Sequence, residues 1–170
     1  QGSGDVSNNR KFTLLGDPAM TLAFPSLQVR TTKINGIAAG LPDTIRAAEK
    51  IVIEGEVTDR QGNLLTGYNG NIYPAVFDKP QQVTTLANDP GSQVTQFSLQ
   101  QNLLFRGKAS VVNGRYSFTF TVPRDINYQY GNGRLSLYAE DGTLDGSGFY
   151  TGFVVGGTGT GATNDNAGPH

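Results

Sequence analysis

The sequence contains no cysteine and no tryptophan, and its one histidine is His170, the last residue. Disulfide bonds, cysteine nucleophiles and cysteine-ligated zinc sites are therefore excluded from these residues. A Ser–His–Asp triad needs a histidine that a carboxylate orients, whereas His170 stands in a Gly/Asn-rich stretch and is interpreted as a solvated terminal residue. We accordingly expect that this chain is not an enzyme by itself.

An excess of charge of one sign is also missing. The 13 Lys and Arg residues nearly balance the 14 Asp and Glu residues, and the formal net charge is -1. This balance gives no strong electrostatic case for nucleic acid or for an anionic membrane surface as a partner. No window approaches the roughly 18 consecutive apolar residues of a transmembrane helix, so no membrane span is predicted. No cofactor is expected, because the G-x-G-x-x-A letters at residues 157–162 lack the helix that must follow a dinucleotide fingerprint.

The two ends of the sequence differ in composition from its middle. The chain starts at Gln1 without a methionine or a secretory leader, and from this we expect a piece cut from a longer chain. Residues 1–24 are interpreted as a disordered start plus the C-terminal tail of a preceding domain. Residues 25–156 are expected to form one domain. Residues 157–170, rich in Gly and Thr at their start, are interpreted as a linker to a following β domain.

Alternation of apolar and polar residues is the strongest structural signal. Residues 115–122 alternate cleanly, which predicts a strand whose core-facing side chains are Tyr116, Phe118, Phe120 and Val122. The dipeptide Asn113-Gly114 precedes this strand and predicts a tight hairpin, because a type I′ turn needs φ > 0 at both central positions. Residues 51–58 predict a second clear strand with Ile51, Ile53 and Val57 facing the core.

Further strands are predicted at intervals along the chain, separated by turn residues: 27–33, 71–77, 95–99, 108–112, 134–140 and 148–155, with weaker candidates at 44–46 and 83–86. No helical stripe is present beyond one short turn within residues 43–50. About eight short strands with turn signals between them are typical of an antiparallel β-sandwich. The predicted fold class is therefore all-β, an immunoglobulin-like antiparallel β-sandwich with a short N-terminal tail from a preceding domain.

Few residues are candidates for chemistry. The loops around Asp141, Asp145 and Asp59 are weak candidates for a calcium site, but they lack EF-hand spacing and are explained by turn chemistry. Glu54 and Glu56 share the outward face of one strand about 7 Å apart, yet no apolar pocket is expected around either carboxyl, so we interpret them as a solvated strand face.

Tyrosines form a second set of candidates, and we expect them to pack against the sheet or a neighbouring domain more readily than to bind a ligand: Tyr73, Tyr128, Tyr130, Tyr138 and Tyr150. Tyr138 and Tyr150 fall on the outward phase of their strands, where aromatic cross-strand pairs also stabilise a sheet. A ligand surface for sugar or peptide is the alternative.

A series of motifs resembles one known family. Residues 12–20, FTLLGDPAM, resemble the segment that closes the catalytic domain of gingipain-like cysteine peptidases, where an LLGDP turn leads into an immunoglobulin-like domain. An ordered set of later segments is similar to the branch of that family that serves as the sortase of type IX secretion: 52–59, 68–79, 104–109, 118–126 and 154–157. The resemblance covers roughly residues 10–169.

The resemblance implies a parent protein of the Bacteroidetes cell surface, at the extracellular face of the outer membrane. That parent would be a cysteine endopeptidase that removes C-terminal sorting domains from secreted cargo, with an outer-membrane barrel protein as a partner. The family's catalytic Cys and His lie upstream of the segment matched here, so no catalytic residue carries over to this sequence. The implied role is a non-catalytic accessory domain that braces the catalytic domain.

Apolar residues near the N-terminus are expected to make the bracing contact, packing across the domain junction or onto the edge of the sandwich: Phe12, Leu14, Leu15, Leu22 and Phe24. Burial of one such side chain contributes roughly 1.5–3 kcal/mol. One alternative is a recognition module that holds the cargo's sorting domain by edge pairing or through the tyrosine face. Another is a free-standing adhesion or carbohydrate-binding domain.

Overall fold

The structure is a computed structural model that describes residues 24–159, and in these residues all regular structure is β. The strands, in chain order, are β1 (Leu27–Ile34), β2 (Ile37–Ala38), β3 (Thr44–Ala47), β4 (Lys50–Thr58), β5 (Gly70–Phe77), β6 (Gln81–Thr84), β7 (Gln96–Leu99), β8 (Leu103–Arg106), β9 (Ala109–Val112), β10 (Arg115–Thr121), β11 (Gly131–Asn132), β12 (Arg134–Glu140), β13 (Asp145–Tyr150) and β14 (Val154–Thr158). Nothing in this part of the chain forms a helix of the length and apolarity that a membrane crossing requires. The all-β prediction is confirmed.

The main sheet closes on itself. Its strands follow the order β12-β13-β1-β4-β10-β9-β5, and β5 then pairs with β12 over seven residue pairs, from Arg134↔Phe77 to Glu140↔Asn71. Neighbouring strands around this ring are antiparallel except β1 and β13, which are parallel. Short strand β8 continues along the β9 side of β5, and β2 pairs with the end of β1. Closure gives each of these seven strands a partner on both sides for at least part of its length, with only two residue pairs between β1 and β13 and between β10 and β9.

The closed ring does not clearly show the two packed sheets of the expected immunoglobulin-like sandwich. Alternation shows that each strand buries one face, and that requirement is the same for two packed sheets and for one closed sheet. The difference comes from long-range pairing, such as Tyr73↔Tyr138 between β5 and β12, which alternation along one strand does not encode. The parallel pairs β1–β13 and β14–β3 likewise depart from the antiparallel expectation.

The core lies inside the ring and follows the predicted alternation. Tyr116, Phe118, Phe120 and Val122 are all buried, and so are the predicted inward residues of β4. Phe105 from β8 stacks on Phe118 and Phe120 with ring centroids 5.7 and 4.9 Å away. The hairpin prediction also holds, since Asn113 and Gly114 have φ of 51° and 73° between β9 and β10.

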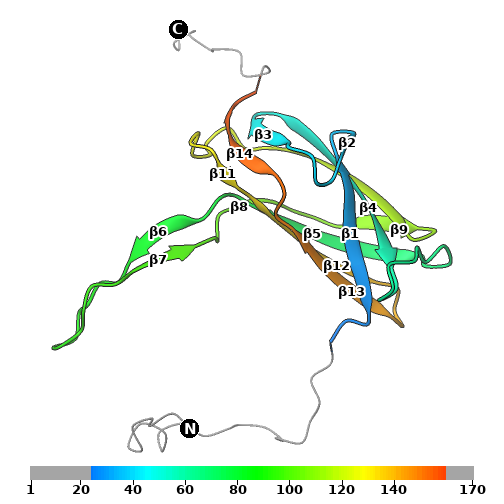
Figure 1. The fold of residues 1–170 in the computed structure, drawn as a ribbon, viewed down its shortest axis with the longest axis horizontal. Coiled ribbons are helices and arrows are strands. Elements are labelled where there is room, and N and C mark those ends of the chain that lie inside the picture. The colour runs from blue at the N-terminus through cyan, green and yellow to red at the C-terminus, as the bar shows by residue number, and fades with distance from the viewer. Residues whose placement is uncertain (1–23, 160–170) are drawn as a thin grey trace, which may run out of the picture.

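Two smaller sheets flank the ring. Strands β11, β14 and β3 form a short three-stranded sheet, and the predicted single strand at 148–155 is in fact two strands, because β13 ends at Tyr150 and β14 begins at Val154. Strands β6 and β7 form a separate hairpin that projects away from the ring (Figure 1). Strands β2, β8 and β11 were not predicted from the sequence.

Candidate functional site

The projecting hairpin is the most unusual feature of the described chain, and we call residues 80–102 the arm. Antiparallel pairing runs from Gln81↔Leu99 to Thr84↔Gln96. Pro80 precedes the first paired residue and has no N–H to donate, so the chain leaves the main sheet between β5 and β6. Within these 23 positions Asp89 is the single charged residue. The arm is therefore an almost uncharged ribbon attached to a charged body.

The arm has two chemically different faces. Because side chains alternate along a strand, Val83, Phe97 and Leu99 share one face, and directly paired Val83 and Phe97 lie side by side on it. Phe97 keeps 43% of its surface exposed. Among the paired residues, the opposite face carries only Gln, Ser and Thr side chains: Gln82, Thr84, Gln96 and Ser98. Leu86 and Val94 lie beyond the paired residues, towards the tip, and are 82% and 67% exposed.

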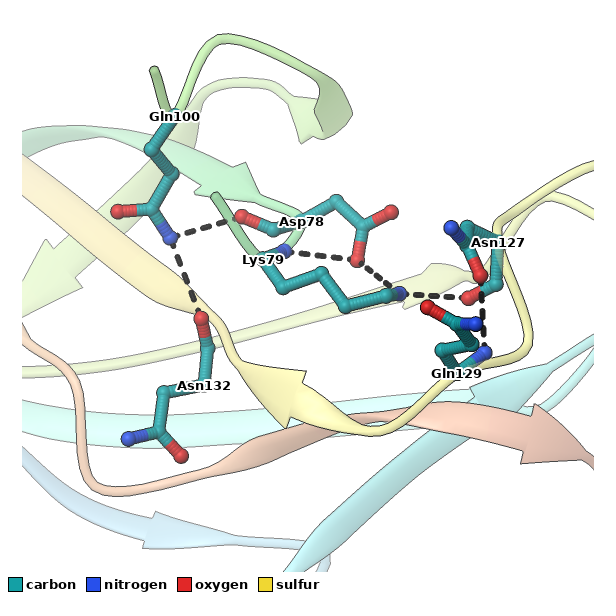
Figure 2. Close-up of polar contacts among 6 residues, drawn as sticks. All are labelled: Asp78, Lys79, Gln100, Asn127, Gln129 and Asn132. Atoms are coloured by element: carbon teal, nitrogen blue, oxygen red, sulfur yellow. Dashed lines mark hydrogen bonds and ion pairs between the residues drawn. The ribbon is translucent and has the colours of Figure 1, made fainter. Parts of the chain in front are cut away.

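A buried ion pair holds the root of the arm. Asp78 and Lys79 follow β5 directly, and their side chains are only 3% and 9% exposed. The Lys79 ammonium donates to Asp78 Oδ1 at 2.9 Å and to the Asn127 carbonyl at 2.5 Å, and the Lys79 backbone N–H donates to the same carboxylate oxygen at 2.8 Å. Figure 2 shows the lysine reaching from the root of the arm to the loop that carries Asn127.

Amide side chains complete this anchor on both sides. Gln100 Nε2 donates to the Asp78 carbonyl at 2.7 Å and to the Asn132 carbonyl at 3.3 Å, which ties the returning strand of the arm to the chain near β11 (Figure 2). Asn127 Oδ1 accepts the Gln129 backbone N–H at 2.9 Å and so fixes the loop that receives Lys79. The root is thus a polar cluster in which hydrogen bonds join three segments that are distant in sequence: 78–79, 100 and 127–132.

A cavity of about 560 Å³ opens beside this root. Its lining combines two carboxylates with amide and apolar side chains, among them Asp78, Gln81, Asn102, Leu103, Asp125 and Asn127. Leu103 is 43% exposed there, whereas Asp125 is an exposed residue in the loop after β10. No cation is among the residues that line the cavity.

The predicted calcium candidates are occupied with local turn contacts. Asp141 Oδ1 accepts the backbone N–H groups of Leu144 and Thr143 at 2.7 and 2.9 Å, and these bonds hold the pKa of its carboxyl below its usual value. The Asn63 side chain, followed by backbone N–H groups, lowers the pKa of Asp59 in the same way. Asp145 accepts the Tyr138 hydroxyl at 3.3 Å. In residues 24–159 no three His, Cys, Asp or Glu side chains gather in a way that could hold a metal ion, and calcium binding stays a prediction.

The other predicted site residues are placed as follows. Phe24 lies at the start of the described chain and is 74% exposed, while Phe12, Leu14, Leu15, Leu22 and His170 lie outside the described residues. Glu54 faces Lys33 at 3.6 Å and Glu56 faces Arg115 at 3.9 Å, so each of these carboxylates is paired with a cation on the sheet surface.

The tyrosines considered as a ligand surface lie at separate places on the molecule. Tyr73 and Tyr138 form a cross-strand pair with ring centroids 6.2 Å apart, and the Tyr73 hydroxyl donates to Glu140 at 3.1 Å. Tyr150 instead packs on Phe153, and its hydroxyl binds the backbone of Gly40 and Gly152. Tyr128 and Tyr130 are exposed in the loop before β11. The outward tyrosines therefore serve the sheet and its loops at separate places.

Sequence reasoning did not find the root of the arm. Alternation describes strands, whereas Asp78 and Lys79 lie between strands and their partners are up to 48 residues away. Two signals were available: the Asp-Lys-Pro junction and the almost uncharged run that follows it.

Comparison with known proteins gives one informative match. No family model matches the sequence, and no curated protein matches it. Among solved structures, the chain is similar to dimeric latent PorU from Porphyromonas gingivalis, with a TM-score of 0.69 and 25% identity over 85% of this chain. The match to Spo0M, a sporulation control protein from Bacillus subtilis, has 14% identity over 79% of this chain and 51% of Spo0M, but its TM-score of 0.46 is too low to support an inference.

The similarity to PorU concerns a domain and not the whole protein. The matched region is 14% of the PorU chain. At the level of the fold, this chain is similar to one β domain of PorU, which agrees in part with the resemblance found in the sequence motifs. The activity of the complete PorU chain therefore bears on this chain only through a proposal.

Proposed function

We propose that this chain is a non-catalytic accessory β domain of a gingipain-like cysteine peptidase of the PorU type, the sortase branch that the sequence motifs resemble. The similarity of 85% of the chain to a part of PorU is the observation that carries the proposal. In this proposal the preceding catalytic domain and a following β domain belong to the same longer polypeptide. We also propose that this domain is related to the immunoglobulin-like domain that follows the catalytic domain in that family.

The composition of the chain supports this division of labour. The sequence has no cysteine and only His170, so a cysteine endopeptidase reaction must take place on other residues of the longer protein. The closed ring is suited to a supporting role, because each of its strands has two neighbours and its core is packed. The parent would act at the cell surface on the C-terminal sorting domains of secreted cargo, together with an outer-membrane barrel protein.

Bracing of the catalytic domain is the proposed role within that protein. Exposed Phe24 starts the described chain, and the apolar residues predicted to pack with it precede it. Deletion of residues 10–24 should lower the melting temperature of the 170-residue chain, because burial of each apolar side chain contributes roughly 1.5–3 kcal/mol. An unchanged melting curve contradicts bracing through this segment.

Two further measurements test the parent assignment. The encoded sequence upstream of Gln1 should contain a peptidase domain with a catalytic cysteine and histidine, and its absence contradicts the proposal. The purified 170-residue chain should not hydrolyse a sorting-domain substrate. Hydrolysis by this chain alone would refute a non-catalytic role.

A recognition module is the second candidate, favoured by the exposed apolar face of the arm. A pull-down of the chain with a purified cargo sorting domain separates the two roles. Bracing predicts no binding, whereas recognition predicts a dissociation constant of about a micromolar or tighter.

A further inference from the structure

The apolar face of the arm continues into the cavity at its root. Gln81 is paired with Leu99 and lies two residues before Val83, so its side chain belongs to the apolar face, and Gln81 also lines the cavity. Leu103, where the chain leaves the arm, lines the same cavity and is 43% exposed. The arm and the cavity therefore form one angled surface, with an apolar wall and a polar recess.

The recess has a negative character. Asp78 commits Oδ1 to Lys79, whereas its Oδ2 has no hydrogen-bond partner among the described residues and is not among the atoms closed off from solvent. Asp78 is only 2% exposed and is one of the residues that line the cavity. Asp125 lines the same recess, and the ion pair with Lys79 offsets the charge of Asp78. One net negative charge thus faces the recess.

The arm, which forms the apolar wall of this surface, has unpaired strand edges. Almost no charge is present along the arm, and both of its strands have an outer edge with alternate unpaired N–H and C=O groups. Natural edge strands are normally protected from further pairing by a lysine, by an inward-pointing charge or by a bulge. Strands β6 and β7 contain no charged residue, so they lack the protection that charge gives. An uncharged extended segment can lie along such an edge, as in β-augmentation.

We propose that the arm and the cavity at its root form a docking site for an extended polypeptide segment that carries an arginine flanked by uncharged apolar residues. Arginine fits the recess because its guanidinium has five donors in a plane, and the residues that line the recess include the acidic Asp78 and Asp125 and no cation. The apolar neighbours of the arginine pack on Val83 and Phe97. This site operates in the 170-residue chain whether or not the parent is a peptidase.

The direct test uses short synthetic peptides and the intact 170-residue chain. The probe is a nine-residue peptide of alternating valine and threonine with one central arginine, and the matched peptides carry glutamine or glutamate at that place. Calorimetric titration should give binding by the arginine peptide that is about tenfold tighter than binding by the glutamine peptide. Added salt should reduce this difference, because Asp125 is exposed. Equal binding of all three peptides, or binding of none, overturns the proposal.

Single substitutions test separately the contributions of the recess and of the apolar face of the arm to peptide binding. Asp125→Asn should remove most of the preference for arginine, while Asp89→Asn, which makes the same charge change at the tip of the arm, should leave the preference intact. Phe97→Ser should weaken the arginine and glutamine peptides by the same factor, roughly fivefold, and Phe149→Ser on the outside of β13 should weaken neither. Asp125→Asn without effect on the preference overturns the assignment of the recess.

Two other occupants are outcomes of the same experiment. If sedimentation shows that the chain forms a dimer that Phe97→Ser abolishes and Asp125→Asn does not affect, the arm pairs with a second copy and the proposal fails. If Ca²⁺ alone binds, is lost in Asp125→Asn and blocks the arginine peptide, the recess is a cation site and the assignment to arginine fails.

Discussion

The ion pair at the root of the arm gives a sharp stability prediction, tested by Lys79→Met. Methionine retains an unbranched stem of similar length, which packs against Gly131, but it removes the ammonium. Asp78 then keeps the backbone N–H of residue 79 at 2.8 Å and loses its cation at 2.9 Å, and the Asn127 carbonyl loses its donor. The substitution therefore leaves an uncompensated carboxylate whose side chain is only 3% exposed.

The magnitude follows from the position of the two carboxylate oxygens. Removing one partner of a buried ion pair costs about 3–5 kcal/mol. Because Asp78 lines an open cavity, we expect water to solvate part of its carboxylate and the cost to lie at the lower end of that range, about 3 kcal/mol. With a urea dependence of about 2 kcal/mol per molar, the midpoint of unfolding should fall by roughly 1.5 M.

Urea unfolding followed by tyrosine fluorescence measures this change, since the chain has no tryptophan. Lys33→Met is the matched control, because Lys33 pairs with Glu54 at 3.6 Å with both side chains about half exposed, and its loss should cost less than about 1 kcal/mol. The double variant Asp78→Asn/Lys79→Met should recover most of the loss by removing the stranded charge. If Lys79→Met and Lys33→Met shift the midpoint equally, the root is not the buried charge pair described here.

Two other predictions concern the ring. Gly55→Ala should lower the free energy of unfolding by about 3 kcal/mol, because the new methyl would lie 2.2 Å from the Arg30 carbonyl and from the Tyr116 ring, whereas Gly67→Ala meets nothing within 4 Å and should be nearly neutral by thermal unfolding. Burial raises the pKa of Tyr68 to about 12 and raises that of Tyr116 as well. The folded state therefore holds these protons more tightly, so stability is intact below about pH 10 and falls as the pH rises through the folded pKa values. Urea titrations across this range should show a smaller alkaline loss for Tyr116→Phe, and an unchanged loss contradicts the assignment.

Local features of the fold were predictable from the sequence. Alternation along 115–122 and 51–58 identified inward residues that are buried in the structure, and Asn113-Gly114 identified the turn between β9 and β10. Both signals act over a few residues, where side-chain alternation and backbone conformation decide the outcome. Closure of the ring depends instead on the pairing of β5 with β12, which joins residues far apart in the sequence, from Phe77↔Arg134 to Asn71↔Glu140.

The arm also shows that short-range sequence patterns predict strands but not how they are placed. Its strands were predicted approximately, at 83–86 and 95–99, but the sequence did not indicate that they form a hairpin apart from the main sheet. Their separation from the ring follows from Pro80 and from the anchoring of Lys79 on Asn127, a contact between segments 48 residues apart. Short-range pattern therefore indicated the strands of the arm and could not indicate where the arm attaches.

The two parts of the molecule depend on different sources of stability. In the ring, burial of residues from all seven strands stabilises a closed sheet. The arm is a two-stranded hairpin with an exposed apolar face, and such hairpins are marginally stable at best in water. Its orientation must therefore come from the root, where Lys79 and Gln100 join both of its strands to the body. Because Asp78 anchors the arm through its contact with Lys79 and also lines the cavity, a ligand in the recess would bind at the point that also sets the position of the arm.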